Sequence, residues 1–234
     1  MNELRFFKKD FEDEVRRSLQ VYDRPLTEKD ALFLYGLDCS NFTFNFEDCD
    51  TLCMFKNLDR LDINIGFEDL SFLTKLQNLE VLGIEFYRDN FDCTYLLPLK
   101  KLEIVFISGG DISGFKFHNF EALTKLPNLK DIGLHEFGTV DLSALKDMPH
   151  LKAFFCGWAD KVYNIEEISN LVNLECLRLI DVTIPNLDFM RSLPNEMALE
   201  LCGVNILDSV DLQELRRFKE CDLDEIEING ERIV

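Results

Sequence analysis

The residues most capable of chemistry are three histidines, eight cysteines and several pairs of acidic side chains. A catalytic or metal site needs such groups at close, fixed spacing. His118, His135 and His150 fall in separate parts of the chain and in different local contexts. No phosphate-binding loop, zinc-protease helix motif or nucleophile-elbow motif occurs. We therefore expect no catalytic residue, no metal site and no cofactor.

The cysteines do not form a pattern that binds zinc. Cys49 and Cys53 stand four residues apart, with no histidine or second cysteine pair beside them. Eight cysteines in 234 residues are also too sparse for a disulfide scaffold. Cys39 and Cys156, with Cys49 as a further candidate, fall where the repeat described below needs a small buried side chain. We expect free structural thiols.

The charge and hydropathy of the chain argue against binding to nucleic acids and membranes. The chain has 44 acidic and 25 basic residues and a net charge of −19. Nucleic acids and anionic membranes are bound by clustered Lys and Arg, and no basic run occurs. No apolar stretch approaches the ~20 residues of a membrane span, and the N-terminus lacks a signal-peptide core. We expect a cytoplasmic protein that binds neither nucleic acid nor membrane.

The elements that position these residues come from an internal repeat. The segment Asn57-Leu58-Asp59-Arg60-Leu61-Asp62-Ile63 recurs as Asn78-Leu79-Glu80-Val81-Leu82-Gly83-Ile84. Later copies begin at Leu102, Leu129, Leu151, Leu174, a degenerate Glu196, and Leu223, the last read as Leu223-x-x-Ile226-x-Ile228. The starting positions step by 21, 23, 27, 22, 23, 22 and 27 residues. This regularity predicts a stack of similar units.

An earlier copy precedes these, and its strand has two alignments. The strand begins at Leu34, as Leu34-x-x-Leu37-x-Cys39, or is carried by Phe42, Phe44 and Phe46. We prefer the first alignment.

The pattern L-x-x-L-x-L, preceded by apolar residues at every third position, resembles leucine-rich repeats. Leu73, Leu76, Leu79 and Leu82 with Ile84 show it. The length near 22 is most similar to the short repeats of internalins and phosphatase regulators. The resemblance implies an α/β, right-handed solenoid, with a curved parallel β-sheet on the concave face and short helices or 3-10 turns on the convex face. It covers residues 34–234 as about eight or nine repeats, and residues 1–33 form an N-terminal helical cap within the same structural domain.

One family feature is missing. The asparagine that usually follows the strand motif, with two residues between, is replaced by Gly66, Tyr87, Gly110, Phe137, Ala159, Val182 and Val204. These residues cannot form the usual asparagine ladder, so the loops need other hydrogen-bond partners. The two 27-residue steps predict longer loops near residues 109–110 and 205–211.

The two ends need caps. Leu4, Phe7, Phe11, Val15 and Leu19 form a helical apolar stripe, and Thr27 with Asp30 suggests a capping box for a second helix. At the other end we expect a convex helix over 208–220. A closing strand over 223–228 follows, whose Glu225 and Glu227 blunt the open edge.

Alternation along the strands predicts which side chains face outward on the concave sheet. The middle of this face is apolar, with Val81, Ile104, Phe106, Phe155 and Ile180, and Trp158 lies where its strand ends. Polar candidates beside them are Glu85, Asp131, His135 and Arg178. Gly83, Gly133 and Gly157 would let a partner's backbone approach closely. The competing interpretation is a register shifted by one residue, which would place Phe155 and Trp158 in the core.

These features predict a non-catalytic module that binds a partner protein on its concave face, with a monomer favoured. The acids Asp62, Glu85, Asp131, Glu136, Asp181 and Glu200 predict a partner with a basic surface. An alternative function is a bacterial immunity protein that occludes a basic toxin. A secreted effector and an enzyme are further alternatives, which the sequence supports less.

Overall fold

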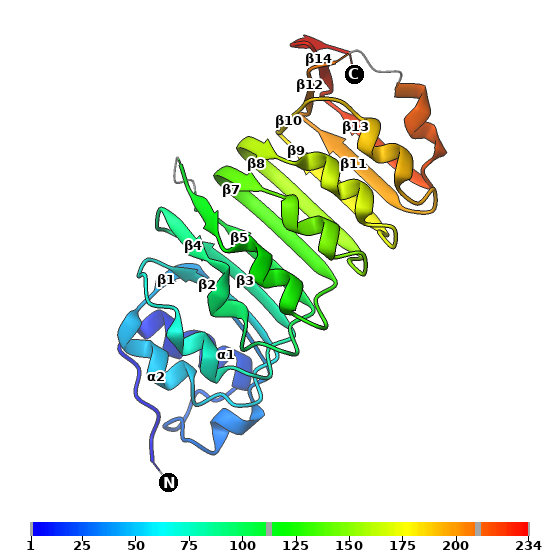
Figure 1. The fold of residues 1–234 in the computed structure, drawn as a ribbon. Helices are drawn as coiled ribbons and strands as arrows, with labels where there is room; N and C mark the ends of the chain where they lie inside the picture. Colours follow the sequence, from blue (N-terminus) through cyan, green and yellow to red (C-terminus); the bar gives the residue numbers. More distant parts are fainter. Residues whose placement is uncertain (1, 111–113, 209–211, 234) are drawn as a thin grey trace.

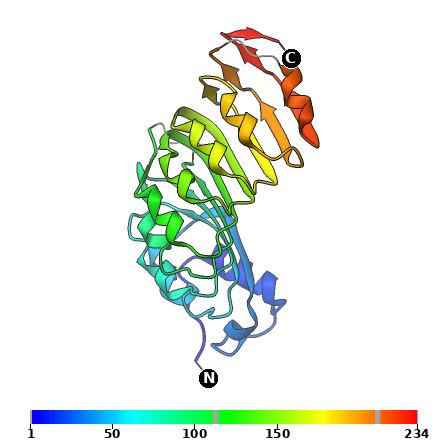
Figure 2. The ribbon, with the colours of Figure 1, turned by 45° about the vertical axis from the view of Figure 1, so that its right-hand side comes forward.

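The fold is a stack of parallel strands. The computed structural model describes residues 2–110, 114–208 and 212–233. Neighbours in the order β1-β2-β3-β5-β7-β8-β9-β11-β13 are all parallel. Figure 1 shows them side by side from the N-terminal to the C-terminal end, with short helices covering one face, and Figure 2 shows the stack bending along its length.

Among the described residues, eleven strands make up the main sheet, and four short strands form a second one. The main sheet contains β1 (Gly36–Phe44), β2 (Arg60–Ile65), β3 (Val81–Phe86), β4 (Asn90–Asp92), β5 (Ile104–Ser108), β6 (Lys116–His118), β7 (Asp131–Asp141), β8 (Ala153–Tyr163), β9 (Cys176–Ile180), β11 (Ala198–Cys202) and β13 (Glu220–Asp224). The second contains β10 (Thr183–Ile184), β12 (Asn205–Ile206), β14 (Glu227–Ile228) and β15 (Glu231–Arg232).

Short 3-10 helices connect the strands across the convex face. A 3-10 helix has three residues per turn, so apolar residues at every third position line one side of it. Ile165, Ile168 and Leu171 follow this rule and are all buried. The 3-10 helices are η1 (Asp30–Phe33), η2 (Phe46–Asp48), η3 (Ser71–Lys75), η4 (Cys93–Leu96), η5 (Phe120–Lys125), η6 (Ser143–Asp147), η7 (Ile165–Asn170), η8 (Asp188–Ser192) and η9 (Leu212–Arg217).

The α-helices lie near the N-terminal end: α1 (Lys9–Leu19) and the short α2 (Cys49–Leu52). Phe11 of α1 is fully buried, with its ring 4.8 Å from that of Phe44 in β1. The predicted apolar stripe was wrong at Phe7, which precedes the helix and is 70% exposed. Asp30 accepts hydrogen bonds from the backbone N–H and the hydroxyl of Thr27, as the capping box predicts, but the helix that follows is the 3-10 helix η1. The division into a cap and a solenoid at residue 33 stays a prediction.

The preferred alignment of the first repeat is confirmed. Leu37 and Cys39 of β1 lie opposite Leu61 and Ile63 of β2. The strand then continues past an irregularity in pairing after Cys39.

The predicted closing strand was wrong. Leu223 belongs to β13 and lies opposite Leu201, at the last inward position of the motif. The last repeat is therefore Phe218-x-x-Cys221-x-Leu223. The second of the predicted 27-residue steps is absent, because this repeat begins earlier than expected. Glu227, expected on the edge of the main sheet, lies in β14 of the second sheet. The helix expected over 208–220 is η9, and residues 209–211 lie outside the described residues.

We call the border where the parallel strands begin the amino edge, and the border where they end the carboxyl edge. At the amino edge, four asparagines that each precede a repeat's first leucine donate to a carbonyl oxygen of the preceding repeat. These bonds, the asparagine ladder, join Asn57 to Leu32 (2.7 Å), Asn78 to Lys56 (2.6 Å), Asn128 to Lys100 (2.8 Å) and Asn173 to Pro149 (2.8 Å). This ladder lies before the strands, whereas the family pattern predicts one only after them.

At the carboxyl edge, aromatic packing takes the place of asparagines. The rings of Phe86 and Phe115 lie 6.3 Å apart, and Phe117 contacts Phe115 at 5.1 Å and Phe137 at 5.5 Å. Phe91 joins the series through Phe86 at 5.6 Å. We call these five residues the phenylalanine spine. Phe115 and Phe117 belong to the 27-residue repeat, whose extra length contains β6, the partner of β4, while residues 111–113 lie outside the described residues.

No helix in the described part of the chain is long and apolar enough to cross a membrane.

Candidate concave binding face

The strands present three columns of side chains on the face opposite the 3-10 helices. In the middle column, Gly83, Phe106, Gly133, Phe155 and Arg178 lie side by side across β3, β5, β7, β8 and β9. The inward positions between them, such as Leu134 and Phe154, are at most 2% exposed. The predicted register is therefore confirmed, and Phe155 faces outward.

All ten residues predicted to bind a partner lie on this face or at its carboxyl edge. Phe106 is 48% exposed and Trp158 is 42% exposed. Arg178 is also exposed, and the others are half-buried: Val81, Glu85, Ile104, Asp131, His135, Phe155 and Ile180. We use the name concave patch for Val81, Ile104, Phe106, Phe155, Trp158 and Ile180. Partner binding by these residues stays a prediction.

The glycines of this face support the protein's own side chains. A β-carbon at Gly133 would lie 2.0 Å from the ring of Phe106, so that ring lies over the glycine. Gly83 is covered in the same way by the carboxylate of Asp62, at 2.3 Å from the position of such a carbon. The space that was predicted to admit a partner's backbone is thus already filled.

Trp158 is held in an unusual conformation. Its φ is +52°, in the left-handed region that bulky residues rarely adopt. The indole lies 4.3 Å from the ring of His135 and 6.3 Å from that of Phe155. Such strain costs on the order of 1–3 kcal/mol and is concentrated at functional sites.

Other repeats have the same backbone turn at the equivalent position. Glu136, Asp181, Gly203 and Glu225 have φ values of +50°, +48°, +62° and +52°. The turn is therefore a property of the fold from β7 onward. Trp158 was expected where its strand ends, but β8 continues to Tyr163, so the turn lies within the strand and turns the tryptophan toward the rest of the concave patch.

Polar groups surround a groove of about 420 Å³ on this face, lined among others by Phe106, Glu85 and Glu136. The Tyr87 hydroxyl donates to Glu85 at 2.7 Å, and this bond raises the pKa of Tyr87 to about 12. The Ser108 hydroxyl lies 3.1 Å from Glu136. The groove thus combines an aromatic wall with carboxylates.

Ser108, His135 and Glu136 lack the geometry of a catalytic triad. A triad places the serine at one imidazole nitrogen and the carboxylate at the other. Here Ser108 Oγ and Glu136 Oε2 both approach Nδ1 of His135, at 3.4 and 3.6 Å. This cluster does not provide an activated nucleophile.

Two acids predicted to attract a partner are already paired. Arg60 lies 3.2 Å from Asp62, and Arg178 lies 2.8 Å from Glu200. Burial raises the pKa of Asp131. Among the described residues, Glu85 and Glu136 line the groove without an Arg or Lys partner and give it a negative character.

The remaining candidate groups lie away from the concave patch. His118 contacts Asn90 at 2.9 Å on β6, and His150 is exposed in a turn at the amino edge. Cys49 and Cys156 are buried free thiols, and burial raises the pKa of each to about 12. Cys39 is likewise buried and free. Within residues 2–110, 114–208 and 212–233, no group of three His, Cys, Asp or Glu residues could hold a metal ion.

Comparison with known proteins establishes the fold. No protein-family model and no curated protein matches this chain. Among solved structures, internalin C2 of Listeria monocytogenes matches with a TM-score of 0.70 and 19% identity over 94% of both chains. TLR13 in complex with ssRNA13 matches with a TM-score of 0.58 and 17% identity, over 88% of this chain and 32% of that one. The protein is a leucine-rich-repeat solenoid, as its sequence predicts.

Internalin F of Listeria monocytogenes is also similar, with a TM-score of 0.69 and 18% identity. The match covers 94% of this chain, which spans 64% of the length of the internalin F chain. The predicted likeness to the short repeats of internalins is confirmed at the level of fold.

Proposed function

We propose that this protein binds a partner protein through the concave patch and the groove beside it. The observation that carries the proposal is the cluster of Phe106, Phe155 and Trp158, which is displayed on a rigid sheet. Exposed aromatic side chains at the centre of a surface are the residues that usually dominate binding energy. Leucine-rich-repeat folds serve widely as interaction modules, which supports this assignment.

The character of the face favours protein over nucleic acid. TLR13 forms a complex with single-stranded RNA, so the fold is compatible with more than one ligand class. In this protein Arg60 and Arg178, on the concave face, are already paired with carboxylates. An RNA backbone would meet Glu85 and Glu136 beside the aromatic residues, and would be repelled.

The partner should present apolar side chains flanked by Lys or Arg. The aromatic residues of the concave patch would supply most of the affinity, and the groove carboxylates would speed association. Because Asp62 and Glu200 are paired, we expect a weaker salt dependence than the net charge of −19 suggests.

The test is affinity capture with the native protein and the double variant Phe106→Ser/Phe155→Ser. Val172→Ser is the control, because Val172 is 57% exposed and lies between η7 and β9, away from this face. We expect the double variant to lose a partner that native protein and control retain, with all three melting at similar temperatures. Equal capture by all three proteins would remove the concave patch as the binding site. A large loss of thermal stability in the double variant would show that its phenylalanines act as core residues.

A further inference from the structure

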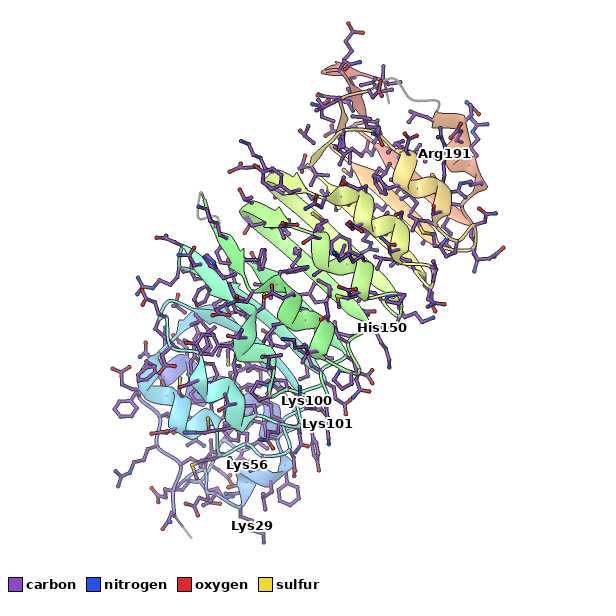
Figure 3. The ribbon with its side chains drawn as sticks, in the orientation of Figure 1. Lys29, Lys56, Lys100, Lys101, His150 and Arg191 are labelled. Atoms are coloured by element: carbon purple, nitrogen blue, oxygen red, sulfur yellow. The ribbon has the colours of Figure 1, made fainter. Side chains whose placement is uncertain are left out.

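The amino edge carries a cluster of lysines that do not form a basic run in the sequence. Lys56, Lys100 and Lys101 come from the turns before β2 and β5, Lys125 is the last residue of η5, and all four are exposed. Figure 3 labels Lys56, Lys100 and Lys101, which lie near one another along this edge of the solenoid. We call these four residues the lysine cluster.

The asparagine ladder holds the cluster together. Asn78 donates to the carbonyl oxygen of Lys56 at 2.6 Å and accepts from Nζ of Lys101 at 2.8 Å. Asn128 donates to the carbonyl oxygen of Lys100 at 2.8 Å, and Nζ of Lys100 lies 3.5 Å from the carbonyl oxygen of Lys125. The lysines are thus placed by the same contacts that align the repeats.

The cluster differs from the other lysines of this edge in its ion pairs. Lys75, Lys130 and Lys152 pair with Asp50, Glu103 and Glu175 at 3.6, 2.8 and 2.6 Å. None of the four cluster lysines has a carboxylate within 4.0 Å among the residues that the structure describes. Glu80 and Asp147, which are exposed, and Asp59, which is half-buried, are the acids near this edge without an ion pair among the described residues, fewer than the four lysines. The local charge is therefore positive.

The acidity of the whole protein does not cancel this local charge. Glu85, Glu136 and Asp181 lie at the far ends of the strands. A five-residue strand such as β5 is about 17 Å long. The Debye length at physiological ionic strength is about 8 Å, so charges on the two edges are largely screened from each other.

We propose that the lysine cluster docks a short acidic segment of a protein, rich in Asp and Glu. Neighbouring strands lie about 4.8 Å apart, so the turns before β2, β3, β5 and β7 span about 14 Å. In an extended peptide, side chains on one face recur about every 6.8 Å, which places about three carboxylates over the cluster. A long polyanion would extend beyond this short cluster along a chain of net charge −19, which disfavours nucleic acid. This docking does not depend on the concave patch.

The experiment measures binding of a fluorescein-labelled oligoglutamate peptide to the full chain by fluorescence anisotropy, at low and physiological ionic strength. The test variant is Lys56→Gln/Lys100→Gln/Lys101→Gln. The control, Lys75→Gln/Lys130→Gln/Lys152→Gln, changes the net charge equally on the same edge but removes lysines that are already paired. We expect the test variant to bind about tenfold more weakly than native protein, and the control to change affinity less than about threefold.

Absence of binding to native protein at low ionic strength would overturn the proposal. Equal losses in the two triple variants would also overturn it, because the effect would then follow net charge alone. Displacement by a single-stranded oligonucleotide at lower concentrations than by unlabelled oligoglutamate would assign the cluster to nucleic acid instead. If the test variant loses its folded circular dichroism spectrum, the single variant Lys100→Glu replaces it, with the same expected direction of change.

Discussion

Neighbouring repeats are held together in different ways at the two edges of the sheet. At the amino edge, the same residue type, asparagine, recurs in four turns and bonds the preceding repeat each time. At the carboxyl edge, the repeated element is a left-handed backbone turn occupied by Glu136, Trp158, Asp181, Gly203 and Glu225. Buried phenylalanines hold part of this edge together. Side chains are therefore free to vary where the backbone and the core carry the structural role.

The largest expected effect tests whether the phenylalanine spine stabilises the carboxyl edge. Phe115 is fully buried between Phe86 and Phe117. Phe115→Ala should lower the free energy of unfolding by about 3–5 kcal/mol, because it removes a ring and leaves a cavity. Urea denaturation measures this loss.

Phe106→Ala is the matched control, since Phe106 is 48% exposed. It should cost less than about 1.5 kcal/mol. Similar losses in the two variants would mean that the spine is no more important to stability than the concave patch.

The second effect concerns backbone strain at Trp158. Gly203 occupies the equivalent turn, and glycine has no β-carbon to oppose a positive φ. Trp158→Gly should therefore be more stable than Trp158→Ala by about 1 kcal/mol, as measured by thermal and urea unfolding. A more stable alanine variant would show that the turn is not strained at this position.

The third prediction concerns the contribution of the asparagine ladder to stability at the amino edge. Asn78→Ala removes the bond to the carbonyl oxygen of Lys56 and should cost about 1 kcal/mol in unfolding free energy. Gln77→Ala, at the neighbouring exposed position, should change stability by less than about 0.5 kcal/mol. If both substitutions are neutral in chemical denaturation, the asparagine ladder does not stabilise this edge.

The smallest effect is local to the groove. The hydrogen bond to Glu85 favours the neutral phenol and raises the pKa of Tyr87 to about 12. Stability from this bond is present below the ordinary tyrosine pKa of about 10 and is lost as pH rises toward 12. Glu85→Gln should move the pKa of Tyr87 back toward about 10, measured by NMR titration of the ring. An unchanged value would assign the shift to burial instead.

The sequence predicted those features that repeat locally. Leucine spacing was sufficient to identify the fold, and alternation was sufficient to place Phe106 and Phe155 on the concave face. The last repeat was misassigned because Phe218-x-x-Cys221-x-Leu223 and Leu223-x-x-Ile226-x-Ile228 both fit the pattern. The pairing of Leu223 with Leu201 distinguishes them, and that is a contact between repeats.

The rest of the candidate site depended on contacts across repeats. The ring of Phe106 lies over Gly133, which is 27 residues away in the chain, and Arg178 pairs with Glu200 of the next repeat. The lysine cluster arises in the same way, from turns that stacking brings together. The left-handed turn at Trp158 was not predictable, because its cause is the fold and tryptophan gives no local signal for it.

Trp158 also gives this protein an internal optical probe. It is the only tryptophan in the chain, so excitation of indole reports on a single position. Its ring is partly open to water and lies 4.3 Å from the imidazole of His135. A ligand that covers the concave patch should shift its emission to shorter wavelengths, whereas a ligand on the amino edge should leave the spectrum unchanged. Unlabelled protein can thus distinguish its two proposed surfaces in one titration.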